Sequence, residues 1–275
     1  MYTPTFSSVW AKVLRFKEHR DALHLLTEQT TIAPANRATL GLRYDAQSDE
    51  WVLYVTHPPD LEETFHRASI ILGDAVHNLR SALDHTSYEL ALWHTGGSLK
   101  RPRSVMFPIV GGPGYQKTPE ELWKDAVARW MREIHGNHRA VIQGLQAHKR
   151  PDAVPHPLLM LRDLDDTDKH RLLNVVVFPA SGLLNPSPAA MLVFILQLLT
   201  GGLEAFAPVR VELGAEVFRA RVPMPAGWRH VDMDMAGYMA PQIAFEDGLE
   251  VVSTLDWLGS SVAKVIAKFL PLTHG

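Results

Sequence analysis

The sequence predicts an α+β protein: a helical bundle-like core, a mostly antiparallel β-sheet and a C-terminal amphipathic helix. Two observations predict this class. Apolar residues recur at three- and four-residue spacing through much of residues 1–173, whereas patterns typical of strands dominate residues 174–246. Helices followed by strands are typical of α+β proteins rather than of alternating βαβ folds. We expect a single domain over 1–275, helix-rich at 1–173 and strand-rich at 174–246, with a final helix at 248–270.

The helical segments are predicted from their apolar spacing and their end signals. We expect helices over residues 7–28, 61–94, 118–147 and 157–173. Gly96 and Gly97 end the second of these, and Thr118-Pro119-Glu120-Glu121 is a strong start for the third. In the last helix, apolar residues fall on one stripe that we assign to the core, with a dimer face as the alternative: Val251, Leu255, Leu258, Val262, Val265 and Phe269.

The strand segments are predicted from alternation and turn residues. Residues 40–57 form a hairpin around the polar turn 46–49, and residues 172–178 are β-rich. Further strands are expected at 190–199, 208–213, 216–222 and 241–246, with Gly214-Ala215 turning between two of them.

Composition excludes several classes of function. The 275 residues carry a net charge of −3, which argues against a protein that coats duplex nucleic acid through a basic field. There is no cysteine, so disulfides, thiolate metal sites and Cys nucleophiles are excluded. The N-terminus lacks a signal-peptide layout, and the most apolar run, 189–199, is too short to span a bilayer. We therefore expect a cytoplasmic protein without a membrane partner.

The most informative segment is GDAVHNLRSALDH at residues 73–85. On a helix, one face collects the residues Asp74, His77, Asn78, Ser81 and His85. Arg80 and Asp84 form an i,i+4 pair beside that face. A concentration of Asp, His, Asn and Arg side chains indicates a catalytic or binding site. The alternative is a hydrogen-bonded network that holds the helix to its neighbours.

A second polar cluster, DLDDTDKHR, occupies residues 163–171. Asp166 and His170 are four residues apart, so a carboxylate can orient an imidazole there as a supported acid–base pair. The alternative is a helix whose early acidic and late basic residues suit the helix dipole. If both clusters belong to one site, His85 and His170 lie near each other, with Arg80 or Arg171 available for an anion.

Arg80 and His85 have the R-x4-H spacing, which resembles the R-x4–6-H signature of the HEPN superfamily of helical nucleotide-binding and ribonuclease domains. The resemblance implies metal-independent RNA cleavage, often by a dimer, with His85 as general acid–base on the ribose 2′-hydroxyl and Arg80 on the phosphate. The chain departs from the family pattern at Ser81, where an Asn, Asp or His is common. The longer sequence pattern, GDxxHNLRSALDH together with DxxDKHR, also resembles an uncharacterised family of bacterial proteins common in actinobacteria. This resemblance implies that the two clusters act as one unit.

From these observations we predict a HEPN-like, metal-independent ribonuclease or nucleotide-binding protein that forms a homodimer and uses no cofactor. The predicted catalytic residues are Arg80, His85 and His170, and the predicted binding or orienting residues are His77, Asn78, Asp84, Asp168 and Arg171. The locally basic stretch 129–150 is a second place for RNA phosphates, or a solvated helix face.

Two alternatives stay open. One is a non-catalytic binding or assembly protein with a buried polar network. The other is a metal-dependent hydrolase that binds Zn, Mn or Fe through Asp74, His77, His85, Asp166 and His170.

Overall fold

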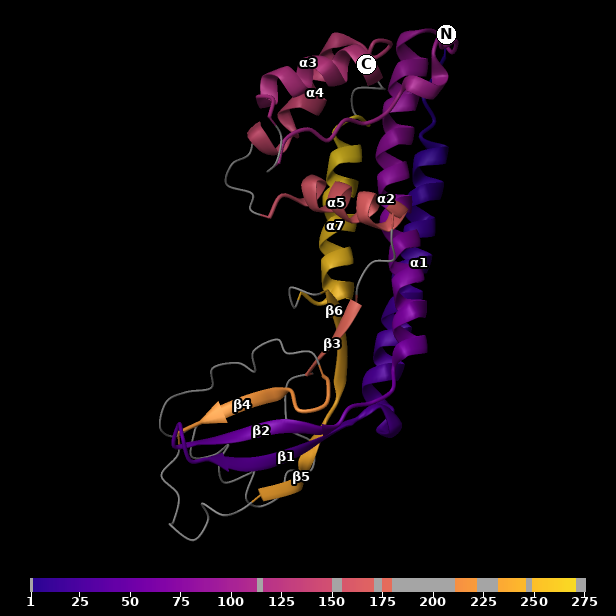
Figure 1. The fold of residues 1–275 in the computed structure, drawn as a ribbon. Helices are drawn as coiled ribbons and strands as arrows, with labels where there is room; N and C mark the ends of the chain where they lie inside the picture. The colour runs from indigo at the N-terminus through magenta and orange to yellow at the C-terminus, as the bar shows by residue number, and fades with distance from the viewer. Residues whose placement is uncertain are drawn as a thin grey trace. The chain divides into compact units, whose positions relative to one another are not determined.

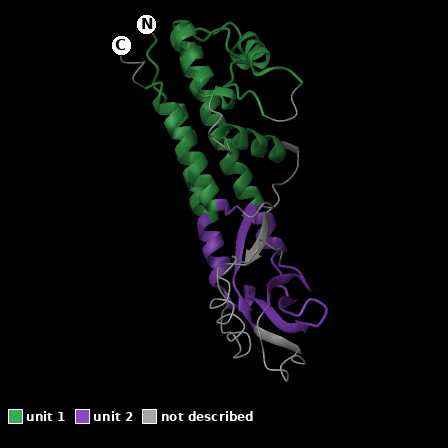
Figure 2. Cartoon of the chain, turned by 90° about the vertical axis from the view of Figure 1, so that its left-hand side faces the viewer, with its two compact units in different colours: residues 1–23, 69–173, 252–275 green, residues 24–68, 174–251 purple. Residues whose placement is uncertain are grey.

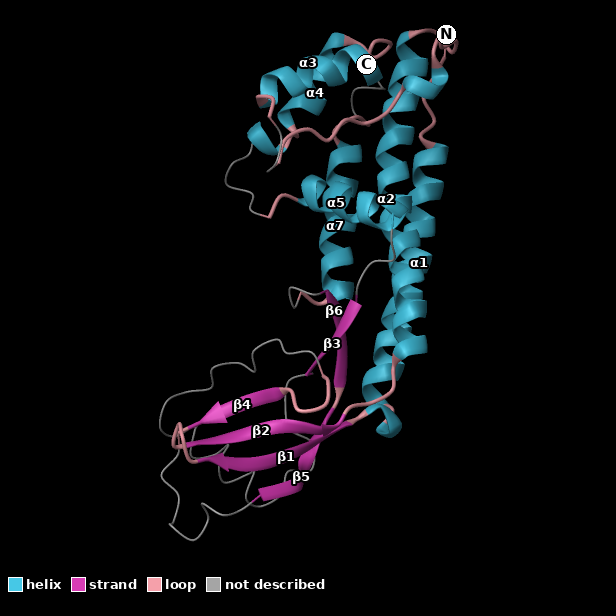
Figure 3. Ribbon diagram, viewed as in Figure 1, coloured by secondary structure: helices cyan, strands magenta, loops and turns pink. Residues whose placement is uncertain are grey.

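The computed structural model describes residues 2–112, 116–149, 155–170, 175–179, 211–221, 232–245 and 249–270. The predicted α+β class is confirmed, with helices and antiparallel strands both present (Figures 1 and 3). The chain divides into two compact units (Figure 2). Unit 1 contains residues 1–23, 69–173 and 252–275, and unit 2 contains residues 24–68 and 174–251. The expectation of a single domain stays a prediction.

The long helices begin and end close to their predicted positions. They are α1 (Ser7–Ile32), α2 (Glu62–His94) and α7 (Val251–Ala267). The stripe predicted for the last helix is buried at all six positions, so it belongs to the core. Helix α7 packs closely on α1, because a Cβ added at Gly259 would lie 2.6 Å from the Phe16 ring. Arg20 adds a bidentate contact to Asp256, with N–O distances of 2.8 and 2.6 Å.

The end of α2 and the start of α3 follow their local signals. Gly96 and Gly97 adopt φ angles of 68° and 97°, a left-handed conformation that ends the helix and suits glycine. Helix α3 (Pro119–Trp130) starts with a capping box in which Thr118 accepts a hydrogen bond from the Glu121 amide and the Glu121 carboxylate accepts one from the Thr118 amide.

The prediction of one helix from 118 to 147 is wrong, because α3 ends at Trp130 and α4 (Gly136–Gly144) begins after a turn. Met131 and Ile134 lie in the connection and are both fully buried. His135 then caps α4 by accepting a hydrogen bond from the Asn137 amide at Nδ1. In this region the core is filled by the side chains of Met131 and Ile134 from the turn, and not by one continuous apolar face of a helix. Helix α5 (Pro157–His170) follows, and residues 171–173 of its predicted range lie outside the described residues.

The described residues also form short 3₁₀ turns: η1 (Pro34–Asn36), η2 (Pro102–Ser104) and η3 (Ala147–Lys149). Among the described residues, no helix combines the length and the apolar composition that a bilayer span requires.

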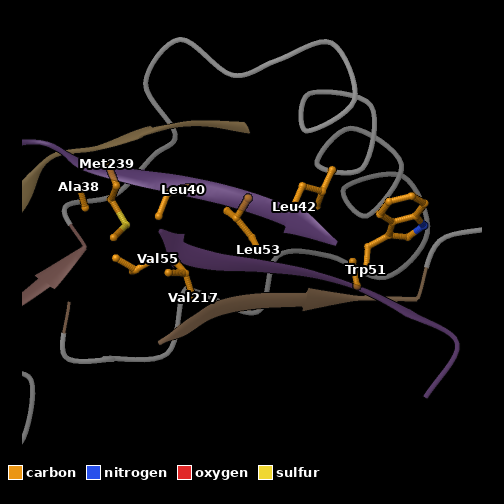
Figure 4. Close-up of a cluster of buried hydrophobic side chains, with 9 residues drawn as sticks. Ala38, Leu40, Leu42, Trp51, Leu53, Val55, Val217 and Met239 are labelled. Carbon is orange, nitrogen blue, oxygen red and sulfur yellow. The ribbon is translucent and has the colours of Figure 1, made fainter. Parts of the chain in front are cut away.

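Unit 2 contains a four-stranded sheet in the order β4-β2-β1-β5, antiparallel throughout. Its strands are β1 (Ala38–Asp45), β2 (Glu50–His57), β4 (Glu216–Ala220) and β5 (Asp232–Met239). The predicted hairpin is therefore confirmed, with Leu42 opposite Leu53. Alternate side chains of the sheet form one apolar cluster (Figure 4), made of Ala38, Leu40, Leu42, Trp51, Leu53, Val55, Val217, Ala220 and Met239.

Two strand predictions differ from the structure. Strand β4 pairs with β2, and residues 211–213, the described part of the expected strand 208–213, are not in a strand. The Gly214 amide donates to the Val55 carbonyl, so this turn connects to β2 rather than closing a local hairpin.

A second, two-stranded sheet pairs β3 (Val175–Pro179) with β6 (Pro241–Phe245). The strand expected at 190–199 lies outside the described residues.

Candidate functional site

The two polar clusters meet where α5 packs against α2 within unit 1. Gly73 permits the approach, because a Cβ at this position would lie only 2.1 Å from Asp168 Oδ1. Leu158 and Leu161 anchor α5 through buried side chains. Arg162 holds the same helix to the preceding loop by donating from Nη1 to the Gly111 carbonyl at 2.7 Å. The expectation that the clusters lie together therefore agrees with the positions of Gly73 and Asp168.

The packing of α5 on α2 places a carboxylate of α5 beside His77 of α2. Its Nδ1 lies 3.2 Å from Oδ1 of Asp165, and its Nε2 lies 3.4 Å from Oγ of Ser81. The Asp165 side chain is 2% exposed, whereas that of His77 is 56% exposed. A carboxylate accepts hydrogen bonds, so the neutral tautomer of His77 that fits this contact has its proton on Nδ1 and its acceptor at Nε2. The site thus presents an oriented imidazole to solvent.

The pairing of His77 with Asp165 was missed from the sequence, where Asp166 was the expected carboxylate. A signal for it exists, because Asp165 lies seven residues after Leu158 and four after Leu161, on the apolar face of α5. A carboxylate on that face must find a partner when the helix packs. Asp166 is exposed, and it lies on another side of the helix.

Arg80 and Asp84 hold a buried loop. Arg80 donates from Nη2 to the Phe107 carbonyl at 2.8 Å, and the Phe107 amide donates to Asp84 Oδ1 at 2.8 Å. The two side chains also form an ion pair of 3.2 Å. Phe107 is fully buried, and Gln146 bonds the next part of the loop through the Val110 amide and the Pro108 carbonyl. This arrangement stabilises the loop that follows α2.

His85 lies in a different environment from Arg80. Burial, together with the charge of Lys12, lowers the pKa of the His85 imidazole against the opposing effect of Asp84 and Glu89. No hydrogen bond among the described residues joins Arg80 to His85. The side-chain amide of Asn78 donates to the Asp74 carbonyl of its own helix at 2.8 Å. This hydrogen bond is local to α2 and does not orient Arg80.

The remaining predicted residues are only partly described. His170 is the last residue of α5, and its side chain lies outside the described part, as does all of Arg171. Asp74 is exposed on α2. Across the described ranges, no group of three or more His, Asp or Glu side chains is arranged to hold a metal ion, so the metal alternative gains no geometric support there.

Comparisons with protein-family models, with curated proteins and with solved structures find no match for this chain.

Proposed function

We propose that this protein acts on a phosphodiester of RNA or of a nucleotide without a metal, with His77 as the general acid–base group. The observation that carries the proposal is the exposed His77 imidazole, oriented by the buried carboxylate of Asp165. Orientation of an imidazole by a buried carboxylate fixes its tautomer and stabilises the imidazolium that forms during proton transfer. Histidine suits this task because its charge changes near neutral pH.

In the proposed reaction, His77 Nε2 removes the proton of the ribose 2′-hydroxyl, and the resulting oxyanion attacks the adjacent phosphorus. The bond from phosphorus to the 5′ oxygen of the next nucleotide breaks, and that oxygen takes the proton from His77. Arg80 lies three residues further along α2, on a neighbouring part of the helix surface. Its guanidinium is paired with Asp84 and bonded to the Phe107 carbonyl, so in this proposal it holds the adjacent loop and does not bind the phosphate. Compared with the expectation from the R-x4-H resemblance, the acid–base role moves from His85 to His77. The predicted homodimer and cytoplasmic location belong to the same proposal.

A second candidate is a non-catalytic binding or assembly protein. The observation that favours it is the use of Arg80 and Asp84 to hold the backbone of Phe107, which is a structural role. Under this function, the contact between His77 and Asp165 serves only to fix α5 on α2.

The two candidates are separated by an RNA-cleavage assay in EDTA, combined with thermal melts. The wild type is compared with His77→Ala, with His85→Ala and with His66→Ala, which removes an exposed histidine from the same helix. We expect His77→Ala to cleave about a hundredfold more slowly while remaining folded, with a lower melting temperature because the buried Asp165 carboxylate loses its contact with His77. Full activity of His77→Ala would refute its role, and loss in His85→Ala alone would return the role to His85. Wild-type protein that neither cleaves nor binds RNA would favour the assembly protein.

A further inference from the structure

Ser81, His77 and Asp165 form a series of three groups in hydrogen-bond contact. The Ser81 hydroxyl lies 3.4 Å from His77 Nε2, and His77 Nδ1 lies 3.2 Å from the Asp165 carboxylate. Because the carboxylate fixes the proton on Nδ1, the Ser81 hydroxyl is the donor to Nε2. A nucleophile bonded to a base that a third group orients is the arrangement that activates serine in covalent catalysis.

The Ser81 hydroxyl differs from two other hydroxyls at and just beyond α2. Thr86 in α2 and Thr95 directly after it donate to carbonyls four residues earlier, at 2.8 and 2.9 Å, as helical hydroxyls commonly do. Ser81 is bonded to an imidazole instead. The exposed His77 and the half-buried Ser81 leave this pair open to a small reagent from solvent.

We propose that Ser81 is an activated nucleophile that accepts acyl groups from activated esters. Ser81 Oγ attacks the ester carbonyl carbon while its proton passes to His77 Nε2. The carbonyl is restored as the ester C–O bond breaks, and the leaving oxygen takes the proton from His77. Water then hydrolyses the acyl-serine by the same proton path. The proposal shares His77 with the proposed phosphodiester site, but it does not require RNA to be cleaved.

The class of substrate follows from what surrounds Ser81. The residue lies in the middle of α2, where the backbone amides are committed to helical hydrogen bonds and cannot serve as an oxyanion hole. Loss of such a donor typically slows acyl transfer by about 10²–10³. Substrates with good leaving groups, such as aryl esters, need this help least. Slow acylation of Ser81 is therefore expected rather than rapid turnover of alkyl esters.

The test uses two reagents on the full chain: a fluorophosphonate probe, read by intact mass and peptide mapping, and p-nitrophenyl acetate, read by release of nitrophenolate. We expect one adduct, mapped to Ser81 and lost in Ser81→Ala. His77→Ala is expected to slow labelling by about a hundredfold, and Asp165→Asn to slow it less. Ser87→Ala is the matched control, because Ser87 is a buried hydroxyl of the same helix without a described partner, and it should label like the wild type.

The absence of an adduct on wild-type protein would overturn the proposal. So would an adduct on another residue, or labelling of Ser81 that His77→Ala leaves unchanged. His77 is largely exposed, so its variant remains informative even if Asp165→Asn fails to fold. Labelling without RNA cleavage would reject only the proposed ribonuclease, and RNA cleavage without labelling would reject only the acylation of Ser81.

Discussion

Replacement of Asp84 by alanine is expected to destabilise the protein through the loop at Phe107. One carboxylate oxygen of Asp84 accepts the Phe107 amide at 2.8 Å and lies 3.2 Å from Arg80 Nη2. Phe107 is fully buried, so its amide loses its partner without gaining water. The Arg80 side chain is only 12% exposed and loses its counter-charge.

The size of the effect follows from these two losses. A hydrogen bond from a buried amide to a charged group contributes about 2 kcal/mol. The ion pair is partly screened, since the Asp84 side chain is 26% exposed, and it contributes about 1 kcal/mol. We therefore expect Asp84→Ala to lower the free energy of unfolding by about 3 kcal/mol. Asp84→Asn keeps an acceptor oxygen but loses the charge, so a cost of about 1 kcal/mol is expected.

Urea-induced unfolding measures this free energy, and hydrogen exchange at the Phe107 amide reports the loop directly. Asp74→Ala is the matched control, because it removes an exposed carboxylate from the same helix and should change stability by less than about 0.5 kcal/mol. If Asp84→Ala behaves like this control, with unchanged exchange at Phe107, the Asp84 carboxylate does not hold the loop and the reasoning is wrong.

Three further predictions concern other contacts. Gly73→Ala should stabilise α2 by about 1 kcal/mol in an Asp168→Ala background but not in the wild type, where the new Cβ meets the carboxylate, and a double-mutant cycle by urea unfolding measures this difference. Thr118→Ala removes the cap of α3 and should cost about 1 kcal/mol in the same assay, whereas Thr118→Ser should cost little. Burial, with the nearby positive charge of protonated histidines, lowers the pKa of His138 below its ordinary 6.5, so the unfolded chain binds the proton more tightly and stability falls as the pH drops below about 6.5. His138→Phe should flatten the dependence of the melting temperature on pH in that range, and an unchanged slope would contradict this origin.

Elements with strong local signals were predictable from the sequence. The stripes of α2 and α7 appear as buried faces because a helix repeats every 3.6 residues and the spacing shows which side is apolar. Gly96 and Gly97 end α2, and Thr118 caps α3, because these signals act on the neighbouring backbone alone. The hairpin of β1 and β2 follows in the same way from alternation and a short turn.

The break between α3 and α4 depended on the tertiary structure. The apolar spacing through residues 119–147 is compatible with one helix, but Met131 and Ile134 are buried from a turn and His135 caps a new helix after it. The pairing of β4 with β2 is similar, because alternation shows which side of a strand is buried but not which strand lies beside it.

The site shows the same division. The sequence by itself placed polar residues of the right types on α2 and α5, and it indicated that the two clusters belong together. Only the tertiary structure paired His77 with Asp165, 88 residues away, and committed Arg80 to the Phe107 carbonyl. The physical reason is that helical periodicity determines the direction of a side chain relative to its own helix, whereas its partner depends on how the helices and the following loop pack together.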